Sequence, residues 1–482
     1  MEKQLVKTLI ITFLFVMGYM YVMQKYFPKQ AQQPQPAQTA ALPAAQREIT
    51  RINIEEDLGC LAEATIGNFV VTYSTKGGYI KKVFTRAYKE ELPFKNVGLI
   101  LEDINKNFTA KVESDRIIFT SSPGAVKEFI FDGYLLKIKN SLPTPSGLVL
   151  FSNPLQDKGL EQQYQESFYV QKESLHKTHI LKTKDTVLDN VEFAGIAGRY
   201  FCASLLKGSY SIKWLKEKDK VYFILLSPPS EISLYLGPQT KKNLQPFGLQ
   251  GIVHYGFFHG IGVGLTWLLN AIYGVTKSWG LSIILLAVVI YLIFFPFTAK
   301  SAKSMKQTQA MQPLITELQK KYKGNLQKAN KEEREMLAEY HKKMMGGCLP
   351  MLFQMPIFFA LWQVLPKLVE LKGASFLWIK DLSLADHAFK LPFPPPVDYL
   401  NLLPIGMMIT GLIQQKFMAP PSTSDEQKSM GSAGVIMSLM FGVFLYNFAS
   451  CLTLYWLTQN ILTLAYQIRV SKARFHVKTP SK

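Results

Sequence analysis

Apolar residues gather in a few long stretches of the chain and leave the remainder mixed or polar. The stretches run from Leu5 to Met23, Trp279 to Ala299, Leu349 to Pro366, Leu400 to Ile413 and Gly434 to Gln467. A helix needs roughly 20 apolar residues to cross a bilayer, and the last stretch is long enough for two crossings. The pattern therefore predicts a polytopic α-helical membrane protein with six transmembrane helices, of which the one that begins at Leu400 is the shortest.

A different pattern fills residues 49–257. Short runs alternate apolar and polar residues, as in NFVVTYSTKGGYIKKVF and VKEFIFDGYLLKIKNSL, with Gly77-Gly78 and Asp132-Gly133 inside them. Alternation with period two is typical of strands that bury one face, and Gly-Gly or Asp-Gly between two such runs indicates a hairpin. A region of this length predicts one large antiparallel all-β sandwich.

Two further helical segments are predicted beside the apolar stretches. Residues 258–278 combine clustered aromatics, several glycines and little charge, and we interpret them as an interfacial amphipathic helix because the next stretch leaves no room for a turn. Residues 300–345 place apolar side chains at helical spacing on both sides of Lys323-Gly324-Asn325, which predicts an antiparallel helical hairpin. We expect Pro313 at a break or in the first turn of one arm, and Gly346-Gly347 at the end of the hairpin.

Positive charge lies beside the predicted spans. The formal net charge is +19; residues 300–345 carry eleven Lys and Arg against five acidic residues, and the tail, residues 469–482, carries five against none. Since Lys and Arg are retained in the cytoplasm, we expect the hairpin and both termini there, and the β-sandwich in the periplasm. Residues 1–25 would then be an uncleaved anchor, and the Gln/Pro/Ala-rich residues 26–48 a linker. Basic segments that adjoin spans do not indicate specific nucleic acid recognition.

Few side chains are candidates for bond chemistry. The sequence contains no Gly-rich phosphate loop, GxSxG elbow, HExxH motif or Cys/His cluster with metal spacing, so we expect no cofactor, no metal site and no enzyme activity. His176 and His179 are interpreted as a surface pair. Cys60 and Cys202 both fall in the predicted periplasmic domain, where a disulfide can form, and the sequence leaves their pairing open.

Six short motifs carry a resemblance to a known family. They are WGLSIILL with Phe295-Pro296, MQPLITELQKKY, GGCLPMLFQMPIFFALW, FLWIKDLS, IQQKF and LYWLTQN, in that order between residues 279 and 460. On these residues the chain resembles the YidC/Oxa/Alb family of membrane protein insertases, and within it the bacterial type with a large periplasmic domain.

The resemblance implies both a fold and a function. It implies a five-helix insertase core over residues 279–468, with a hydrophilic groove that is open to the cytoplasm and to lipid but closed toward the outside. The implied function is that of a membrane protein insertase and folding chaperone in the bacterial inner membrane, acting on nascent membrane proteins alone or with the Sec translocon. The implied partners also include membrane lipids and, for the hairpin and basic tail, the ribosome or signal-recognition machinery.

Polar side chains inside the predicted spans are candidates for the groove. Amides in a membrane are costly unless they meet partners or water. For any single Gln or Asn, the alternative that it merely joins two helices stays open, whereas several on different spans favour a shared wet interior. The candidate substrate groove comprises Tyr291, Gln354, Gln363, Gln414, Gln415, Trp456, Gln459 and Asn460. Of these, Gln415 and Trp456 match positions that line the groove in the family.

Tyr291 departs from the family's pattern. The family usually has an arginine five residues before the proline that matches Pro296, and here the chain has no Lys or Arg between Lys277 and Lys300. A charge at mid-membrane costs about 2.5–3.5 kcal/mol or more, and a tyrosine hydroxyl costs less. We therefore expect this groove to work by hydration and hydrogen bonding rather than by a fixed charge.

Two other classes of protein compete with this interpretation. A solute transporter would need a path that opens in turn to both membrane faces, and usually internal repeats, which the sequence does not show. A carbohydrate-active periplasmic domain on a membrane anchor would need only one span, which leaves the other five unexplained.

Overall fold

The computed structural model describes residues 61–122, 124–141, 147–154, 164–217, 220–253, 258–322, 331–392, 398–418, 435–436 and 438–471. Residues 23–254 form one compact unit, the β-unit, and residues 255–482 with 1–22 form another, the helical unit. Each is described by itself. The expected anchor, the linker, Cys60 and all but the first three residues of the basic tail lie outside the described residues.

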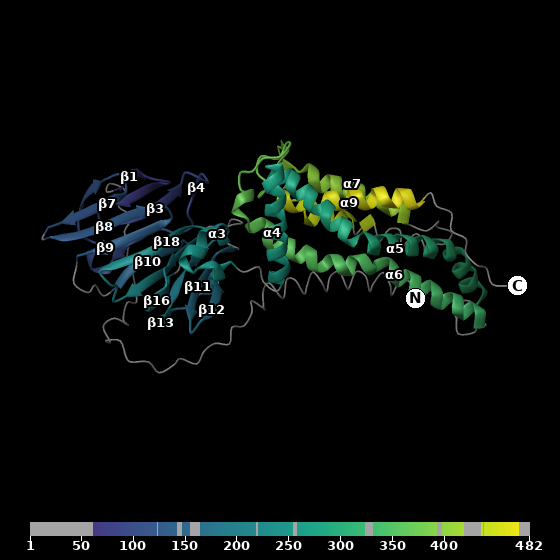
Figure 1. The fold of residues 1–482 in the computed structure, drawn as a ribbon, viewed down its shortest axis with the longest axis horizontal. Helices are drawn as coiled ribbons and strands as arrows, with labels where there is room; N and C mark the ends of the chain where they lie inside the picture. The colour runs from purple at the N-terminus through teal and green to yellow at the C-terminus, as the bar shows by residue number, and fades with distance from the viewer. Residues whose placement is uncertain are drawn as a thin grey trace. The chain divides into compact units, whose positions relative to one another are not determined.

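The described part of the β-unit folds into three antiparallel sheets (Figure 1). Its strands are β1 (Leu61–Ile66), β2 (Phe69–Ser74), β3 (Tyr79–Thr85), β4 (Glu90–Glu91), β5 (Leu99–Ile100), β6 (Thr109–Val112), β7 (Arg116–Ser121), β8 (Ala125–Asp132), β9 (Leu135–Asn140), β10 (Gly147–Pro154), β11 (Glu166–Gln171), β12 (Ser174–His179), β13 (Thr186–Val191), β14 (Phe193–Ala197), β15 (Phe201–Leu205), β16 (Tyr210–Lys216), β17 (Lys220–Leu226) and β18 (Glu231–Pro238). The sheet orders are β1-β2-β3-β4, β13-β16-β17-β10-β5 and β12-β11-β14-β15-β18-β9-β8-β7-β6.

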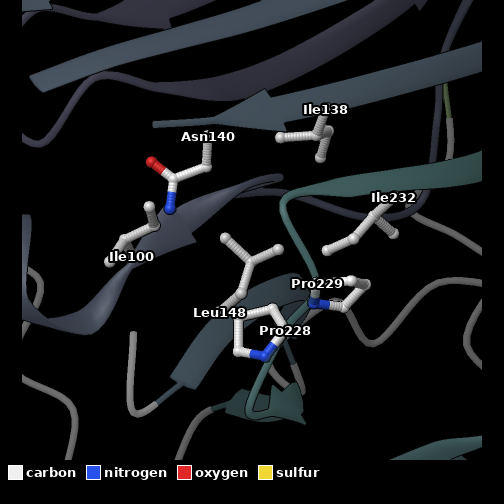
Figure 2. Close-up of a pocket in the computed structure, with 7 residues that line it drawn as sticks. All are labelled: Ile100, Ile138, Asn140, Leu148, Pro228, Pro229 and Ile232. Atoms are coloured by element: carbon white, nitrogen blue, oxygen red, sulfur yellow. The ribbon is translucent and has the colours of Figure 1, made fainter. Parts of the chain in front are cut away.

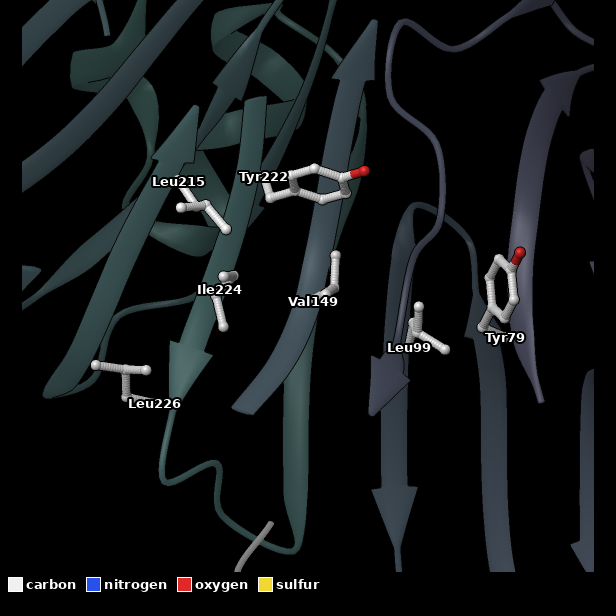
Figure 3. Close-up of a cluster of buried hydrophobic side chains, with 7 residues drawn as sticks. All are labelled: Tyr79, Leu99, Val149, Leu215, Tyr222, Ile224 and Leu226. Atoms are coloured by element: carbon white, nitrogen blue, oxygen red, sulfur yellow. The ribbon is translucent and has the colours of Figure 1, made fainter. Parts of the chain in front are cut away.

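The sheets pack in two layers. Rings of the nine-stranded sheet meet rings of the four-stranded sheet, since Phe131 lies 5.9 Å from Phe69 and Phe119 lies 5.7 Å from Tyr73 between ring centroids. The two smaller sheets share one buried cluster, shown in Figure 3, of Tyr79, Leu99, Val149, Leu215, Tyr222, Ile224 and Leu226. They therefore form the second layer together, and the alternating pattern correctly predicted a β-rich domain, although strands such as β14 and β15 are buried on both faces.

Two hairpin turns lie where the sequence predicted them. Gly77 and Gly78 connect β2 to β3 with φ of 84° and 55°, and Gly133 follows β8 with φ of 58°. A positive φ favours glycine because a side chain would collide with the backbone. Both turns are confirmed.

A buried ion pair lies inside the β-unit. The side chains of Lys127 on β8 and Asp103 are both 0% exposed, with Nζ and Oδ2 2.8 Å apart. Lys127 Nζ donates a hydrogen bond to the carbonyl of Gly77 at 2.8 Å and lies 4.6 Å from the ring centroid of Phe108. Lys106, which is partly exposed, contacts the other carboxylate oxygen of Asp103 at 2.6 Å. Two cations thus hold one buried carboxylate.

The helical unit contains two unusually long helices. Its described helices are α4 (His259–Thr276), α5 (Trp279–Lys321), α6 (Lys331–Val364), α7 (Leu402–Met418) and α9 (Ser450–Ser471), and residues 438–444 are also helical. Helix α5 has 43 residues and α6 has 34. Each is longer than a bilayer requires.

The breaks predicted at Pro313 and at Gly346-Gly347 do not occur, so these two predictions are wrong. Helix α5 runs from the apolar stretch into the first hairpin arm with Pro296 and Pro313 inside it. Helix α6 likewise continues through Gly346-Gly347, so these glycines do not end the hairpin. A helical glycine costs only about 1 kcal/mol, which packing along the neighbouring helix outweighs.

The count of six spans stays a prediction. Among the described residues, one helix, which begins at Trp279, is long and apolar enough to cross a membrane by length and composition. Helix α7 has only 17 residues, as the short stretch at Leu400 anticipated. The first predicted span and part of the stretch from Gly434 lie outside the described residues.

The C-terminal part of α5 and the N-terminal part of α6 pack as an antiparallel pair. Met311, Ile315 and Leu318 of α5 form one buried cluster with Leu337 and Tyr340 of α6. Tyr340 donates its hydroxyl hydrogen bond to Gln312, and Glu333 accepts hydrogen bonds from Lys321 Nζ and Tyr322 Oη, both at 2.8 Å. The apolar stripes in residues 300–345 thus face one another.

Candidate functional site

Three helices meet at the hydroxyl group of Tyr455. Tyr455 on α9 is fully buried, and its Oη accepts hydrogen bonds from Nε2 of Gln354 on α6 and of Gln459 on α9, both at 3.2 Å. Gln459 Nε2 also donates to the carbonyl of Ala287 on α5 at 2.9 Å. Two predicted groove residues therefore belong to one hydrogen-bonded network, the Tyr455 network, which joins α5, α6 and α9.

Two more candidate residues connect helices through backbone carbonyls. Tyr291 on α5, which is 9% exposed, donates its hydroxyl hydrogen bond to the carbonyl of Leu462 on α9 at 3.3 Å. Gln414 Nε2 on α7 donates to the carbonyl of Asn460 on α9 at 2.8 Å. Helix α9 is thus the common partner of α5, α6 and α7.

Trp456 stands among aromatic side chains. Its ring centroid lies 4.9 Å from that of Phe358 on α6 and 5.2 Å from that of Phe441. Trp456 follows Tyr455 in the sequence, so the two side chains leave α9 in different directions. The aromatic cluster and the Tyr455 network therefore occupy neighbouring sides of the same helix.

Gln363 and Gln415 lie outside the Tyr455 network. Oε1 of Gln363, near the end of α6, is buried without a hydrogen-bond partner in the described part of the chain. Gln415 is half-buried on α7. Between described residues, no hydrogen bond joins either amide to another candidate groove residue. The groove that all eight residues were predicted to line stays a prediction.

The hydrogen bonds bear on the alternative that the sequence left open. Gln354, Gln414 and Gln459 each bond to another helix, which is the behaviour of amides that join helices. The residue that sequence reasoning missed is Tyr455, the acceptor at the centre of the network. A signal was present, because Tyr455 and Gln459 are four residues apart and such residues are neighbours on a helix.

A small apolar pocket lies in the described part of the β-unit. Figure 2 shows its lining, which consists of Ile100, Ile138, Asn140, Leu148, Pro228, Pro229 and Ile232. Asn140 supplies the one amide among these seven side chains, and none of the seven carries a carboxylate or an imidazole. This lining offers no acid/base pair for bond chemistry.

The helical unit and the whole chain match known proteins. A family model described as "60Kd inner membrane protein" matches residues 271–478. A protein of Syntrophobacter fumaroxidans named "Membrane protein insertase YidC" is 40% identical over 50% of this chain and 44% of its own length. One of the same name from Geobacter sulfurreducens is 28% identical over 98% of this chain and 99% of its own length. This chain thus spans less than half of the Syntrophobacter fumaroxidans protein and nearly all of the Geobacter sulfurreducens protein.

One solved structure resembles this chain along most of its length. A crystal structure of an active YidC insertase, with its first transmembrane domain resolved, covers 88% of this chain and 95% of its own, with 18% sequence identity and a TM-score of 0.42.

Proposed function

We propose that the chain is a membrane protein insertase of the YidC type, which inserts transmembrane segments of nascent membrane proteins into the inner membrane and assists their folding. It acts alone or with the Sec translocon. The groove lies among α5, α6, α7 and α9, opens to the cytoplasm and to lipid, and is lined by the eight candidate residues.

The Tyr455 network is the observation that supports this proposal most. It gathers polar side chains between the helices that the family match covers. The opposite character appears on the outside of α5, where Leu292 and Ile293 are 62% and 60% exposed. An incoming segment needs both environments. Its polar flank requires polar groups between the helices, and its apolar stretch requires an apolar outer face.

The amides lower the barrier to transfer by offering hydrogen bonds. A carboxamide has two N–H donors and a carbonyl acceptor, and the bonds that Gln354, Gln414 and Gln459 make to other helices use only their N–H groups. Between described residues no hydrogen bond reaches their side-chain carbonyl oxygens, so these oxygens can accept from the N–H groups of a polar flank or from water. Each polar group left unsatisfied in hydrocarbon costs several kcal/mol, so insertion becomes faster without any bond being made or broken.

The orientation follows the charge. The hairpin of α5 and α6 and the basic tail lie in the cytoplasm, where they receive substrates from the ribosome or signal-recognition machinery, and the β-unit lies in the periplasm. Lys and Arg retention on the cytoplasmic side supports this orientation.

Photo-crosslinking tests the function and the groove together. Cells depleted of their own insertase are complemented with this chain, which carries a photo-reactive amino acid at Gln415 or Trp456. We expect growth to be restored and both positions to crosslink a ribosome-bound nascent membrane protein, whereas the same probe at Val275, which is 86% exposed on α4, crosslinks far less. Failure to complement would overturn the function. Complementation with equal crosslinking at all three positions would overturn the groove.

Substitution of Tyr291 tests the role of its hydroxyl. If hydrogen bonding at this position replaces the family's arginine, Tyr291→Phe should slow insertion of substrates with acidic external flanks, and Tyr291→Arg should preserve it. Tyr466→Phe, on the neighbouring helix α9 with its ring 5.0 Å from that of Phe295, is the control and should have no effect. Wild-type insertion by both Tyr291→Phe and Tyr291→Ala would exclude the role.

A further inference from the structure

The segment between α6 and α7 exposes large apolar side chains. Leu377 is 74% exposed and Trp378 is 43% exposed, and we call these two residues the apolar tip. Phe389, farther along the same segment, is 62% exposed. Single exposed apolar residues are common on protein surfaces, whereas adjacent ones at the end of a loop mark an interaction site.

The apolar tip is held in place by its surroundings. The backbone of Phe376 and that of Ile379 exchange two hydrogen bonds of 2.9 Å, which forces Leu377 to a φ of 54°. Ile379 is buried, and the indole of Trp378 donates a hydrogen bond to Asp386 Oδ2 at 3.2 Å. A leucine in the left-handed region is strained, so this loop maintains the exposure of Leu377 against an energetic cost.

The loop lies at the level where three helices begin. The ring of Phe376 packs on Gly280, the second residue of the membrane-spanning helix α5. The carbonyls of Leu382 and Leu384 accept hydrogen bonds from the first residues of α9 at 2.9 Å and 2.6 Å. Asp386 accepts hydrogen bonds from the amides of the first two residues of α7 at 2.7 Å and 3.0 Å. The loop is therefore fixed at one end of the helical unit, beside the N-terminal ends of α5, α7 and α9.

We propose that the apolar tip inserts into the lipid leaflet at which α5 begins. Leucine and tryptophan favour the boundary between acyl chains and headgroups. Exposed Lys380 and Lys390 flank the tip and Phe389 and complement the phosphates of anionic lipids. The inference rests on α5 as a membrane span and on the packing of the loop, and it does not depend on the substrate groove.

Spin-label accessibility in vesicles tests the proposal. The four cysteines, Cys60, Cys202, Cys348 and Cys451, are replaced by alanine, and a single cysteine is introduced at Leu377, at Ser375 in the same loop, or at Leu181 in the β-unit. The full chain is reconstituted in vesicles of phosphatidylethanolamine and phosphatidylglycerol. Oxygen concentrates in lipid and a neutral nickel chelate stays in water, so the ratio of their collision rates with the label reports its depth.

We expect the label at Leu377 to collide mainly with oxygen, and the labels at Ser375 and Leu181, which are both exposed, to collide mainly with nickel. Equal nickel access at all three positions would place the tip in water and overturn the proposal. Low access of both reagents at Leu377 would indicate a protein contact and would also overturn it.

Brominated lipids give an independent measurement that needs no label. Bromine on the acyl chains quenches only tryptophans that it contacts, so the difference in quenching between the wild-type chain and Trp378→Phe isolates Trp378. The proposal requires that difference to be positive. Phenylalanine preserves the apolar character of a side chain that is already part-exposed, and an unchanged melting temperature in detergent verifies that the variant is folded.

Discussion

Lys127 is a buried residue whose charge state affects the stability of the β-unit. Burial lowers the pKa of its ammonium from 10.5 to about 8, while Asp103 beside it acts in the opposite direction. The unfolded chain therefore binds a proton between pH 8 and pH 10.5 that the folded chain has lost. Stability must rise with pH across this window, because the state that binds more protons is favoured at low pH.

We expect this rise to amount to about 3 kcal/mol, the free energy of a shift of this size. Hydrogen exchange of β8 and β9 in the full chain, corrected for the intrinsic effect of pH, measures it. Burial raises the pKa of Tyr222 from 10.0 to about 12, so in every variant the folded state holds this proton longer and stability falls with rising pH above pH 10. The comparison is therefore with Lys127→Met, in which the rise should disappear. Parallel pH curves for the two proteins would exclude this role of Lys127.

Tyr455 should stabilise the helical unit through its hydroxyl group. Phenylalanine at this position would leave the amides of Gln354 and Gln459 without their shared acceptor. A buried donor without a partner costs about 1–3 kcal/mol, so we expect Tyr455→Phe to lower the melting temperature in detergent. The half-buried Tyr466 on α9 provides the control Tyr466→Phe. Equal melting temperatures for the two variants would mean that water replaces the hydroxyl.

The sequence predicted which polar residues lie in the helical unit better than it predicted their partners. An amide within an apolar stretch stands out, so Gln354, Gln414 and Gln459 were evident. Their acceptors were not, because the carbonyls of Ala287 and Asn460 are present in any sequence and become partners only when helices pack. Tyr455 escaped notice because a tyrosine in a span is ordinary at a membrane boundary.

Helices α5 and α6 show how packing overrides local sequence. Glycine and proline predicted interruptions at Pro313 and Gly346-Gly347, yet both helices continue. A helix that already contacts a neighbour on both sides of a weak position gains more from continuing as a helix than it loses at one residue. Period and composition therefore predicted the arms of the hairpin correctly, whereas the boundaries of the helices required knowledge of tertiary contacts.

Leu337 should carry much of the stability of the hairpin. It is 8% exposed in the cluster formed by Met311, Ile315, Leu318 and Tyr340, and removal of a buried leucine side chain costs about 2–5 kcal/mol. We expect Leu337→Ala to speed hydrogen exchange in residues 305–321 and 331–343, with less effect on α9. Glu339→Ala, two residues away and exposed on the same helix, should change exchange little. Similar effects from both variants would indicate that the arms are not coupled through the cluster.

Gly280 should be required for the contact between α5 and the loop that follows α6. A Cβ atom added there would lie 2.0 Å from Phe376, whereas one added at Gly264 on α4 would meet nothing within 4 Å. We expect Gly280→Ala to displace Phe376 and destabilise the protein by about 1–3 kcal/mol. Gly264→Ala should be neutral or stabilising by up to about 1 kcal/mol, because alanine favours a helix. In the same detergent, Gly280→Ala should lower the melting temperature, whereas Gly264→Ala should leave it unchanged or raise it.

The division of the chain into a β-unit and a helical unit was accessible from the sequence because it depends on periodicity over long segments. Alternating runs give way to helical spacing near residue 257, and the described residues are β-rich before that point and helical after it; the expected domain limits themselves stay predictions. The number of membrane crossings was harder to predict from the sequence. Most of the predicted spans contain amides, proline or few residues, so composition alone does not separate a spanning helix from a buried one.

The distribution of charge makes a prediction about the whole molecule. Eleven basic residues in residues 300–345 and five in the tail should fix the hairpin in the cytoplasm. In the variant that lacks native cysteines, a cysteine at the exposed Glu317 should then react with a membrane-impermeant maleimide only after cells are permeabilised. Cysteines at Leu181 in the β-unit and at Ser375 should react in cells whose outer membrane alone has been opened.

The three positions together test the number of crossings between them. Reaction at Ser375 but not at Glu317 in intact spheroplasts requires an odd number of crossings between them, which α6 provides. Reaction at Leu181 requires another odd number between the β-unit and the hairpin, which α5 alone satisfies if α4 lies in the interface rather than across the membrane. If Leu181 and Glu317 reacted under the same conditions, α4 would have to be a span. That result would contradict both the interfacial helix and the retention of the basic hairpin opposite the β-unit.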